Sequence, residues 1–154
     1  MLKEKIQSDL NKMLKERNET AVSTLRMALA SVTNKEKEKK YKENSDKLTD
    51  EEVLQVLSSE AKKRKEAIIE FEKGGRNDLV VKEKAELEII KQYLPEQLSD
   101  DELKKIVKEA IEKVGAKEIK DMGKIMAEVM PKIKGRADGS QVNNIAKDLL
   151  KSSF

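Results

Sequence analysis

Apolar residues recur every three or four positions along most of the chain. The first series contains Leu2, Ile6, Leu10, Met13 and Leu14, which is the spacing of one face of an α-helix. Similar series run through residues 22–32, 53–71, 103–114, 122–130 and 142–150, and another helix fits residues 77–94. No segment gives convincing evidence of a β-strand. The pattern therefore predicts an all-α fold of six or seven helices.

Residues that start and stop helices divide this pattern. Thr49 to Glu52 and Ser99 to Glu102 both have a hydroxyl followed three positions later by a carboxylate, the signature of a capping box at a helix start. Pro95 stops the preceding helix. We therefore expect an N-terminal helical bundle of about four helices in residues 1–95 and a small C-terminal three-helix domain in residues 96–154.

Composition narrows the possible chemistry. Charged residues make up 41% of the chain, aromatic residues 3%, and there is neither cysteine nor histidine. A thiolate nucleophile, an imidazole base and a Cys/His zinc site are thereby excluded. Carboxylates are scattered, and no pair stands out for acid–base catalysis. We expect no catalytic residue, no metal and no cofactor, and we do not expect an enzyme that acts alone.

The same residues bear on location. No apolar run approaches the length of a membrane span, and charged residues interrupt the region where a signal peptide has its apolar core. We expect a soluble, cytoplasmic protein without a membrane partner.

A basic segment stands out between Lys113 and Arg136. It contains seven cations and three acidic residues, and Lys132, Lys134 and Arg136 lie close to Gly135, ahead of the last predicted helix. These residues could neutralise phosphate groups beside helix N–H donors. They could equally be an ordinary turn with lysines at the negative end of a helix. The net charge of only +3 is evidence against a general nucleic-acid binder.

Two arginines lie next to apolar stripes rather than opposite them. Arg26 lies between Val22 and Leu29, and Arg64 precedes Ile68 by one helical turn. We expect both guanidinium groups to form structural ion pairs at the edge of the core. The candidate partners are Glu60, Glu83 and Glu86.

Three parts of the sequence resemble a known family. They are TLRMALA from residue 24, EFEKGGRNDL from residue 70 with YLPEQLS from residue 93, and DMGKIM from residue 121 with MPKIKGRADG from residue 130. Together they resemble the GatB/YqeY family in its small, stand-alone YqeY-like form. The resemblance covers nearly the whole chain, and the last pair of segments is the most specific.

The resemblance implies an all-helical protein of two parts. It is similar to the helical tail domain of the B subunit of the glutamine-dependent Asp/Glu-tRNA amidotransferase, which contacts tRNA while other domains perform catalysis. The leading hypothesis is a non-catalytic module for structured, tRNA-like RNA. Its candidate RNA-binding residues are Lys120, Lys124, Lys132, Lys134 and Arg136.

Two further functions remain open. The chain could be a protein-interaction adaptor. It could also be an accessory of a carbon–nitrogen ligase with glutamine as amido-N-donor, in which case a partner subunit would have to supply the nucleophile. With few aromatic residues available for base stacking, any RNA contact should be to the backbone.

Overall fold

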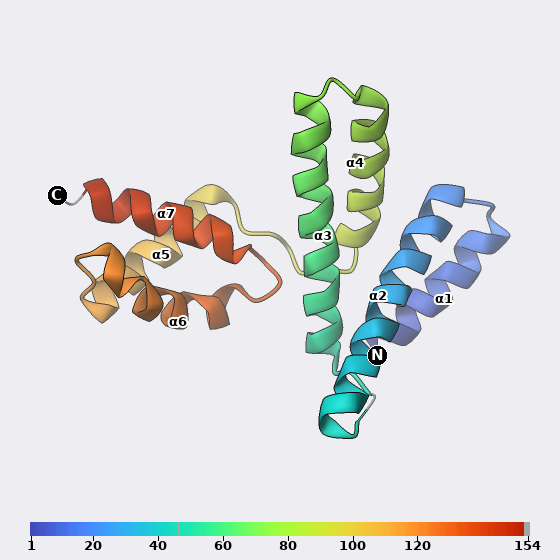
Figure 1. The fold of residues 1–154 in the computed structure, drawn as a ribbon, viewed down its shortest axis with the longest axis horizontal. Coiled ribbons are helices and arrows are strands. Elements are labelled where there is room, and N and C mark those ends of the chain that lie inside the picture. The colour runs from blue at the N-terminus through green and yellow to red at the C-terminus, as the bar shows by residue number, and fades with distance from the viewer. Residues whose placement is uncertain (46, 153–154) are drawn as a thin grey trace. The chain divides into compact units, whose positions relative to one another are not determined.

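The chain folds into helices connected by short loops. The computed structural model describes residues 1–45 and 47–152, and within them it contains seven α-helices, one 3₁₀ turn and no strand. The predicted all-α class is confirmed. The elements, shown in Figure 1, are α1 (Leu2–Lys15), α2 (Glu19–Glu43), α3 (Asp50–Lys73), α4 (Asn77–Lys91), α5 (Asp100–Val114), η1 (Ile119–Asp121), α6 (Met122–Ile133) and α7 (Gly139–Ser152).

Side-chain caps fix the starts of α3 and α5. The hydroxyl of Thr49 accepts a hydrogen bond from the N–H of Glu52 at 3.2 Å, and the Glu52 carboxylate accepts one from the N–H of Thr49 at 2.7 Å. Ser99 and Glu102 form the same reciprocal pair at 3.2 and 3.0 Å. Each box satisfies two N–H groups that a helix start leaves without partners.

The chain divides into two compact units, Met1–Leu94 and Pro95–Phe154. In the first, α1 pairs with α2 and α3 pairs with α4, as Figure 1 shows, and α2 also packs against α3 and α4. The core of this unit is built from the apolar stripes seen in the sequence. Its most deeply buried members include Ile6, Val32, Val53, Leu57 and Ile90.

The second unit is formed by α5, η1, α6 and α7. Helix α5 packs against α6 and α7, which also pack against each other. Its core includes Val107, Ile125, Val129 and Val142, all fully buried. The last two positions of the predicted domain, 153–154, lie outside the described residues.

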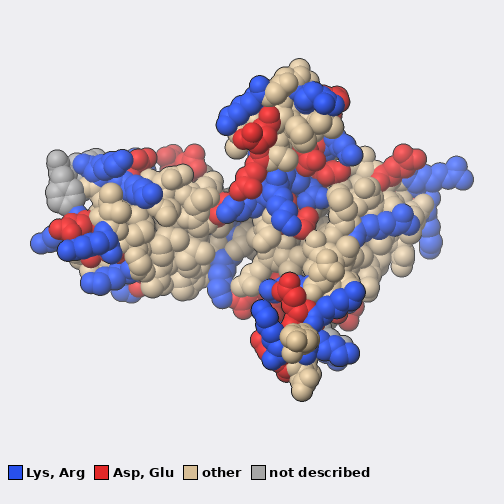
Figure 2. Space-filling model, viewed as in Figure 1, with Lys and Arg blue, Asp and Glu red and all other residues tan. Residues whose placement is uncertain are grey.

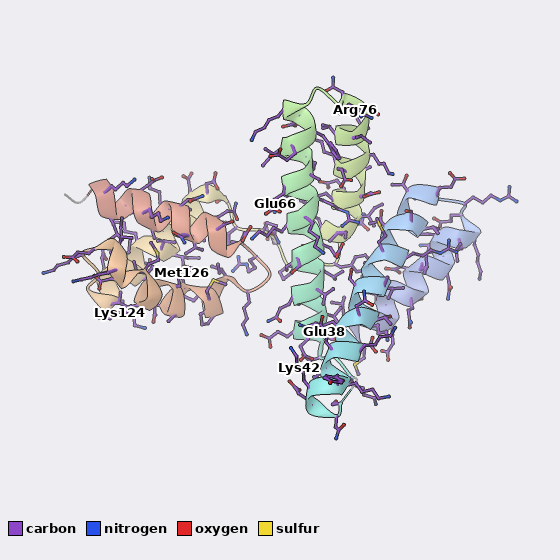
Figure 3. The ribbon with its side chains drawn as sticks, in the orientation of Figure 1. Glu38, Lys42, Glu66, Arg76, Lys124 and Met126 are labelled. Carbon is purple, nitrogen blue, oxygen red and sulfur yellow. The ribbon has the colours of Figure 1, made fainter. Side chains whose placement is uncertain are left out.

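Gly139, the first residue of α7, lies directly against α6. A Cβ atom at this position would lie 3.7 Å from Cε of Met126 and 3.8 Å from Sδ of Met130. These are ordinary van der Waals distances, so two methionines of α6 cover the start of α7. In Figure 3, Met126 lies on the side of α6 that faces α7.

Charges of both signs are interspersed over much of the visible surface. Figure 2 shows mixed Lys, Arg, Asp and Glu over α1–α4, and a broad area without charged residues over the C-terminal unit. None of the helices in the described residues combines the length and the apolar character needed to cross a membrane.

Candidate nucleic-acid interface

The candidate RNA-binding residues all lie between η1 and the turn before α7. Gly115 ends α5 in the left-handed conformation, with φ +66°, which glycine adopts without a Cβ penalty. The Asp121 carboxylate then accepts hydrogen bonds from the N–H groups of Lys117 and Glu118 at 3.0 and 3.2 Å. These two bonds lower the pKa of Asp121, with help from the charges of Lys124 and Lys120. The Asp121 carboxylate therefore stabilises the turn that includes residues 117–121.

Lys120 and Lys124 lie on either side of Asp121. Nζ of Lys120 forms a salt bridge to Glu118 at 3.1 Å, and its side chain remains largely exposed. Lys124 is exposed on the first turn of α6, and Figure 3 labels it near the N-terminal end of that helix. Both ammonium groups are accessible to solvent and therefore to an anionic ligand.

Lys132 belongs to an ion-pair network between α5 and α6. The Glu128 carboxylate lies 2.7 Å from Nζ of Lys113 and 3.4 Å from Nζ of Lys132. The hydrogen bond from Lys113 is the main cause of the lowered pKa of Glu128, and Lys132 adds to it. Two cations thus share one carboxylate, which leaves the network positively charged.

Arg136 is hydrogen-bonded to the backbone of the segment that precedes α5. Its Nε donates a hydrogen bond to the backbone carbonyl of Glu96 at 3.3 Å, and its backbone carbonyl accepts one from the N–H of Leu98 at 2.9 Å. The side chain is half-buried, whereas Lys134 at the end of α6 is exposed. One N–H of the Arg136 guanidinium is therefore used by the backbone of the chain itself.

Gln97 completes this connection, and the sequence did not single it out as a functional position. Its side-chain amide donates to the backbone carbonyls of Gly135 at 2.8 Å and Pro95 at 3.0 Å. We call residues 95–98 together with 135–136 the linker clamp. Residues 95–98 and 135–136 both lie within segments that carry the family resemblance. This shared location is the sequence feature that could have indicated the connection.

The start of α7 is occupied by an acidic residue. The Asp138 carboxylate accepts a hydrogen bond from the N–H of Ser140 at 3.1 Å, and its own N–H donates to the side chain of Gln141 at 3.1 Å. A phosphate at this helix end would meet a negative charge. The lysine side chains, rather than the N–H groups of α7, are therefore the better candidate contacts.

Arg64 is buried in the first unit, with 5% of its surface exposed. Its Nη1 contacts the Glu60 carboxylate at 3.0 Å, and its Nε lies 3.4 Å from the Glu86 carboxylate on α4. The hydroxyl of Ser31 on α2 also donates to Glu60, at 2.8 Å. One guanidinium therefore connects α3 with α4, and its carboxylate partner extends the network to α2.

Arg26 does not form the structural ion pair that the sequence predicted for it at the edge of the core. It is exposed, and within the described residues no carboxylate lies within salt-bridge distance of it. Its neighbour Leu25 occupies the core, and one residue along a helix corresponds to a rotation of about 100°. That rotation turns the Arg26 side chain toward solvent, so the predicted ion pair at the core edge does not form.

No candidate metal centre emerges from residues 1–45 and 47–152. They contain no group of three or more acidic side chains placed to hold a metal ion, and the sequence has no histidine or cysteine.

Comparison with known proteins gives one family and a set of fungal relatives. The family model described as "Yqey-like protein" matches residues 3–150. The "Altered inheritance of mitochondria protein 41, mitochondrial" of Pyrenophora tritici-repentis is 32% identical over 140 residues, covering 89% of this chain and 74% of that protein. The protein of the same name from Saccharomyces cerevisiae strain YJM789 is 31% identical over 131 residues, covering 80% and 68%.

A third relative with this name comes from Eremothecium gossypii and is 34% identical over 90 residues, covering 58% of this chain and 46% of that protein. All three names describe mitochondrial proteins. The expectation of a cytoplasmic protein is contradicted by these names. That expectation came from the lack of a membrane span and from the charged N-terminal residues, neither of which distinguishes the cytoplasm from a mitochondrial compartment.

Proposed function

The chain belongs to the YqeY-like protein family, and we propose that it is a non-catalytic helical module that binds structured RNA through its C-terminal unit. The observation that carries this proposal is the charge balance of the segment from Lys113 to Arg136. Seven cations face three acidic residues there, and each of the three acidic residues is already engaged by a neighbour within the segment. Positive charge therefore remains for a ligand.

The lysines are arranged along one helix. Lys124 and Lys132 are eight residues apart in α6, which corresponds to about 12 Å along the helix axis. Lys120 precedes this helix and Lys134 follows it, and all four side chains are exposed. A row of ammonium groups of this length suits several consecutive phosphates better than one small anion.

The composition favours contacts to the RNA backbone. Residues 95–152 contain no aromatic side chain, so this part of the chain has no platform for stacking bases. Recognition would then rest on the shape and charge of a folded RNA. The three segments that resemble the GatB/YqeY family imply a similarity to the tRNA-contacting tail of the amidotransferase B subunit, which supports tRNA as the first RNA to examine.

An electrophoretic mobility shift with bulk tRNA at low salt tests the proposal. The informative variant is Lys124/Lys132/Lys134→Gln, which spares Arg136 because that residue holds the linker clamp. The matched control, Lys105/Lys108/Lys147→Gln, removes the same charge from exposed positions on α5 and α7. We expect the first variant to bind more than about tenfold more weakly and the control to change less than about twofold.

Two results would count against RNA binding at α6. One is the absence of any shift with the unmodified protein. The other is an equal loss of binding in both triple variants, which would indicate that only total charge matters. Circular dichroism of each variant establishes that a loss of binding does not reflect a loss of helix.

A further inference from the structure

The C-terminal unit has an open groove on the side formed by α5 and α7. The groove has a volume of about 610 Å³. One wall is the N-terminal part of α5, with Asp100, Asp101 and Lys104. The other is a stripe of α7 that begins at Gln141 and continues through Asn144, Ile145, Asp148 and Leu149. These residues of α7 follow the spacing of a single helix face.

The floor of the groove is apolar. Ile145 and Leu149 pack against the core of the unit yet remain partly exposed, so one flank of each side chain contacts solvent. A partner side chain that covered them would remove apolar surface from water, at a gain of about 25 cal/mol per Å². The groove thus favours a partner that offers apolar side chains.

The rim of the groove is acidic and lacks internal partners. Asp100, Asp101 and Asp148 are exposed, and none has a salt bridge or a side-chain hydrogen bond within the part of the chain that the structure describes. Lys104 is the one cation in the lining. The carboxylates do not form a group able to hold a metal ion in those residues.

The contrast with the α6 side of the same unit is informative. There, Glu118, Asp121 and Glu128 are each satisfied by a lysine or by backbone N–H groups. The rim carboxylates, in contrast, have no such partner in the described residues and can pair with cations of an external partner. The three carboxylates of the rim repel phosphate groups, so the groove favours a cationic partner over nucleic acid.

We propose that this groove binds a basic amphipathic helix of a protein partner. Apolar side chains of that helix would lie on Ile145 and Leu149, and flanking Lys or Arg residues would pair with Asp101 and Asp148. A helix lying between two helices is a common mode of peptide recognition. The site is separate from the lysines of α6, so it goes beyond RNA binding and does not depend on it.

A fluorescence anisotropy titration with a synthetic peptide tests the groove. The probe is a labelled peptide of about 18 residues, long enough to form a helix, with Leu at positions i, i+3, i+4 and i+7, Lys at positions flanking this stripe and Ala elsewhere. Two matched peptides carry Glu in place of Lys, or Ser in place of Leu. We expect saturable binding of the Leu/Lys peptide only.

Charge reversal locates the binding site. Asp101→Lys/Asp148→Lys should weaken binding at least tenfold, because it places like charges opposite the peptide. The control, Glu109→Lys/Glu112→Lys, makes the same change of net charge at exposed positions of α5 outside the groove and should change binding less than about twofold. A neutral pair, Asp101→Asn/Asp148→Asn, provides a second readout if the reversal disturbs folding.

Several outcomes would overturn the proposal. They are no saturable binding of the Leu/Lys peptide, equal binding of the Leu/Lys and Ser/Lys peptides, and equal weakening by both charge reversals. Amide chemical-shift changes confined to residues 120–134 on adding the peptide would likewise reject this groove as the separate site. Loss of tRNA binding alone would reject only the RNA proposal.

Discussion

The side-chain amide of Gln97 donates a hydrogen bond to the backbone carbonyl of Gly135 at 2.8 Å, joining positions 38 residues apart. The adjacent bond from the N–H of Leu98 to the carbonyl of Arg136 measures 2.9 Å. Together they attach the segment that precedes α5 to the turn that follows α6. The turn needs glycine at position 135, where φ is +71°. The two segments therefore act as one structural element, the linker clamp.

Removing the Gln97 side chain should loosen this clamp. Gln97→Ala leaves two carbonyls without their donor, and we expect the free energy of unfolding to fall by about 1–2 kcal/mol. Gln92→Ala serves as the control, because Gln92 is exposed and should change stability by less than about 0.5 kcal/mol. Urea unfolding followed by circular dichroism measures both. Equal effects of the two substitutions would mean that the clamp adds nothing to stability.

Arg64 should matter far more to stability than Arg26. Arg64→Met leaves the buried carboxylate of Glu86 without its cation and leaves Glu60 with Lys63 alone, at 3.5 Å, and breaking a buried ion pair typically costs about 3–5 kcal/mol. Arg26→Met removes an exposed guanidinium and should cost less than about 0.5 kcal/mol. Urea unfolding midpoints compare the two variants directly. Similar midpoints would show that the network around Arg64 is not needed for the packing of α3 and α4.

Glu60 should make stability depend on acid pH. Burial favours its neutral form, but hydrogen bonds from Ser31 and Arg64 and the nearby positive charges outweigh burial and lower the pKa. Because the pKa is lower in the folded state, the charged carboxylate stabilises the fold at pH values above the unfolded-state pKa of about 4.3. This stabilisation is lost as the pH falls through the folded-state pKa. The stability difference between the unmodified protein and Glu60→Gln should therefore shrink with acidification. A difference that stays constant from about pH 6 to pH 3 would contradict this.

Tyr93 should produce the opposite dependence at alkaline pH. Burial raises the pKa of its hydroxyl, and the hydrogen bond to Asp9 at 2.6 Å raises it further. The unfolded chain then releases this proton first, near pH 10, so stability falls as pH rises above that value. Tyr93→Phe should lose about 1 kcal/mol at neutral pH and less above about pH 10. The control is Tyr41→Phe, since the Tyr41 side chain is 93% exposed. A Tyr93→Phe deficit unchanged at about pH 11 would argue against the Asp9 bond.

Local signals explain which parts of the fold the sequence predicts well. Helix periodicity and the capping boxes at Thr49 and Ser99 involve neighbours within four positions, and both boxes form as predicted. The different environments of Arg26 and Arg64 depend instead on which helices pack together, because Glu86 reaches Arg64 only from α4. Their similar positions beside apolar stripes could not distinguish them.

The candidate interface follows the same rule. The excess of cations between Lys113 and Arg136 is visible in the sequence. The sharing of Glu128 by Lys113 and Lys132 requires α5 and α6 to be adjacent. The attachment of Arg136 to Glu96 requires the linker clamp. Pairings across 15 or 40 positions leave no periodic trace, which is why the sequence grouped Arg136 with the lysines.

The most direct test of RNA binding at α6 is the salt dependence of the affinity for tRNA. Each lysine that neutralises a phosphate adds about 0.7–0.9 to the slope of log affinity against log salt concentration. Lys124/Lys132/Lys134→Gln should therefore reduce the slope by about 2–3, and Lys105/Lys108/Lys147→Gln should leave it almost unchanged. An unchanged slope in the first variant, or affinity without salt dependence in the unmodified protein, would contradict an interface built from the lysines of α6.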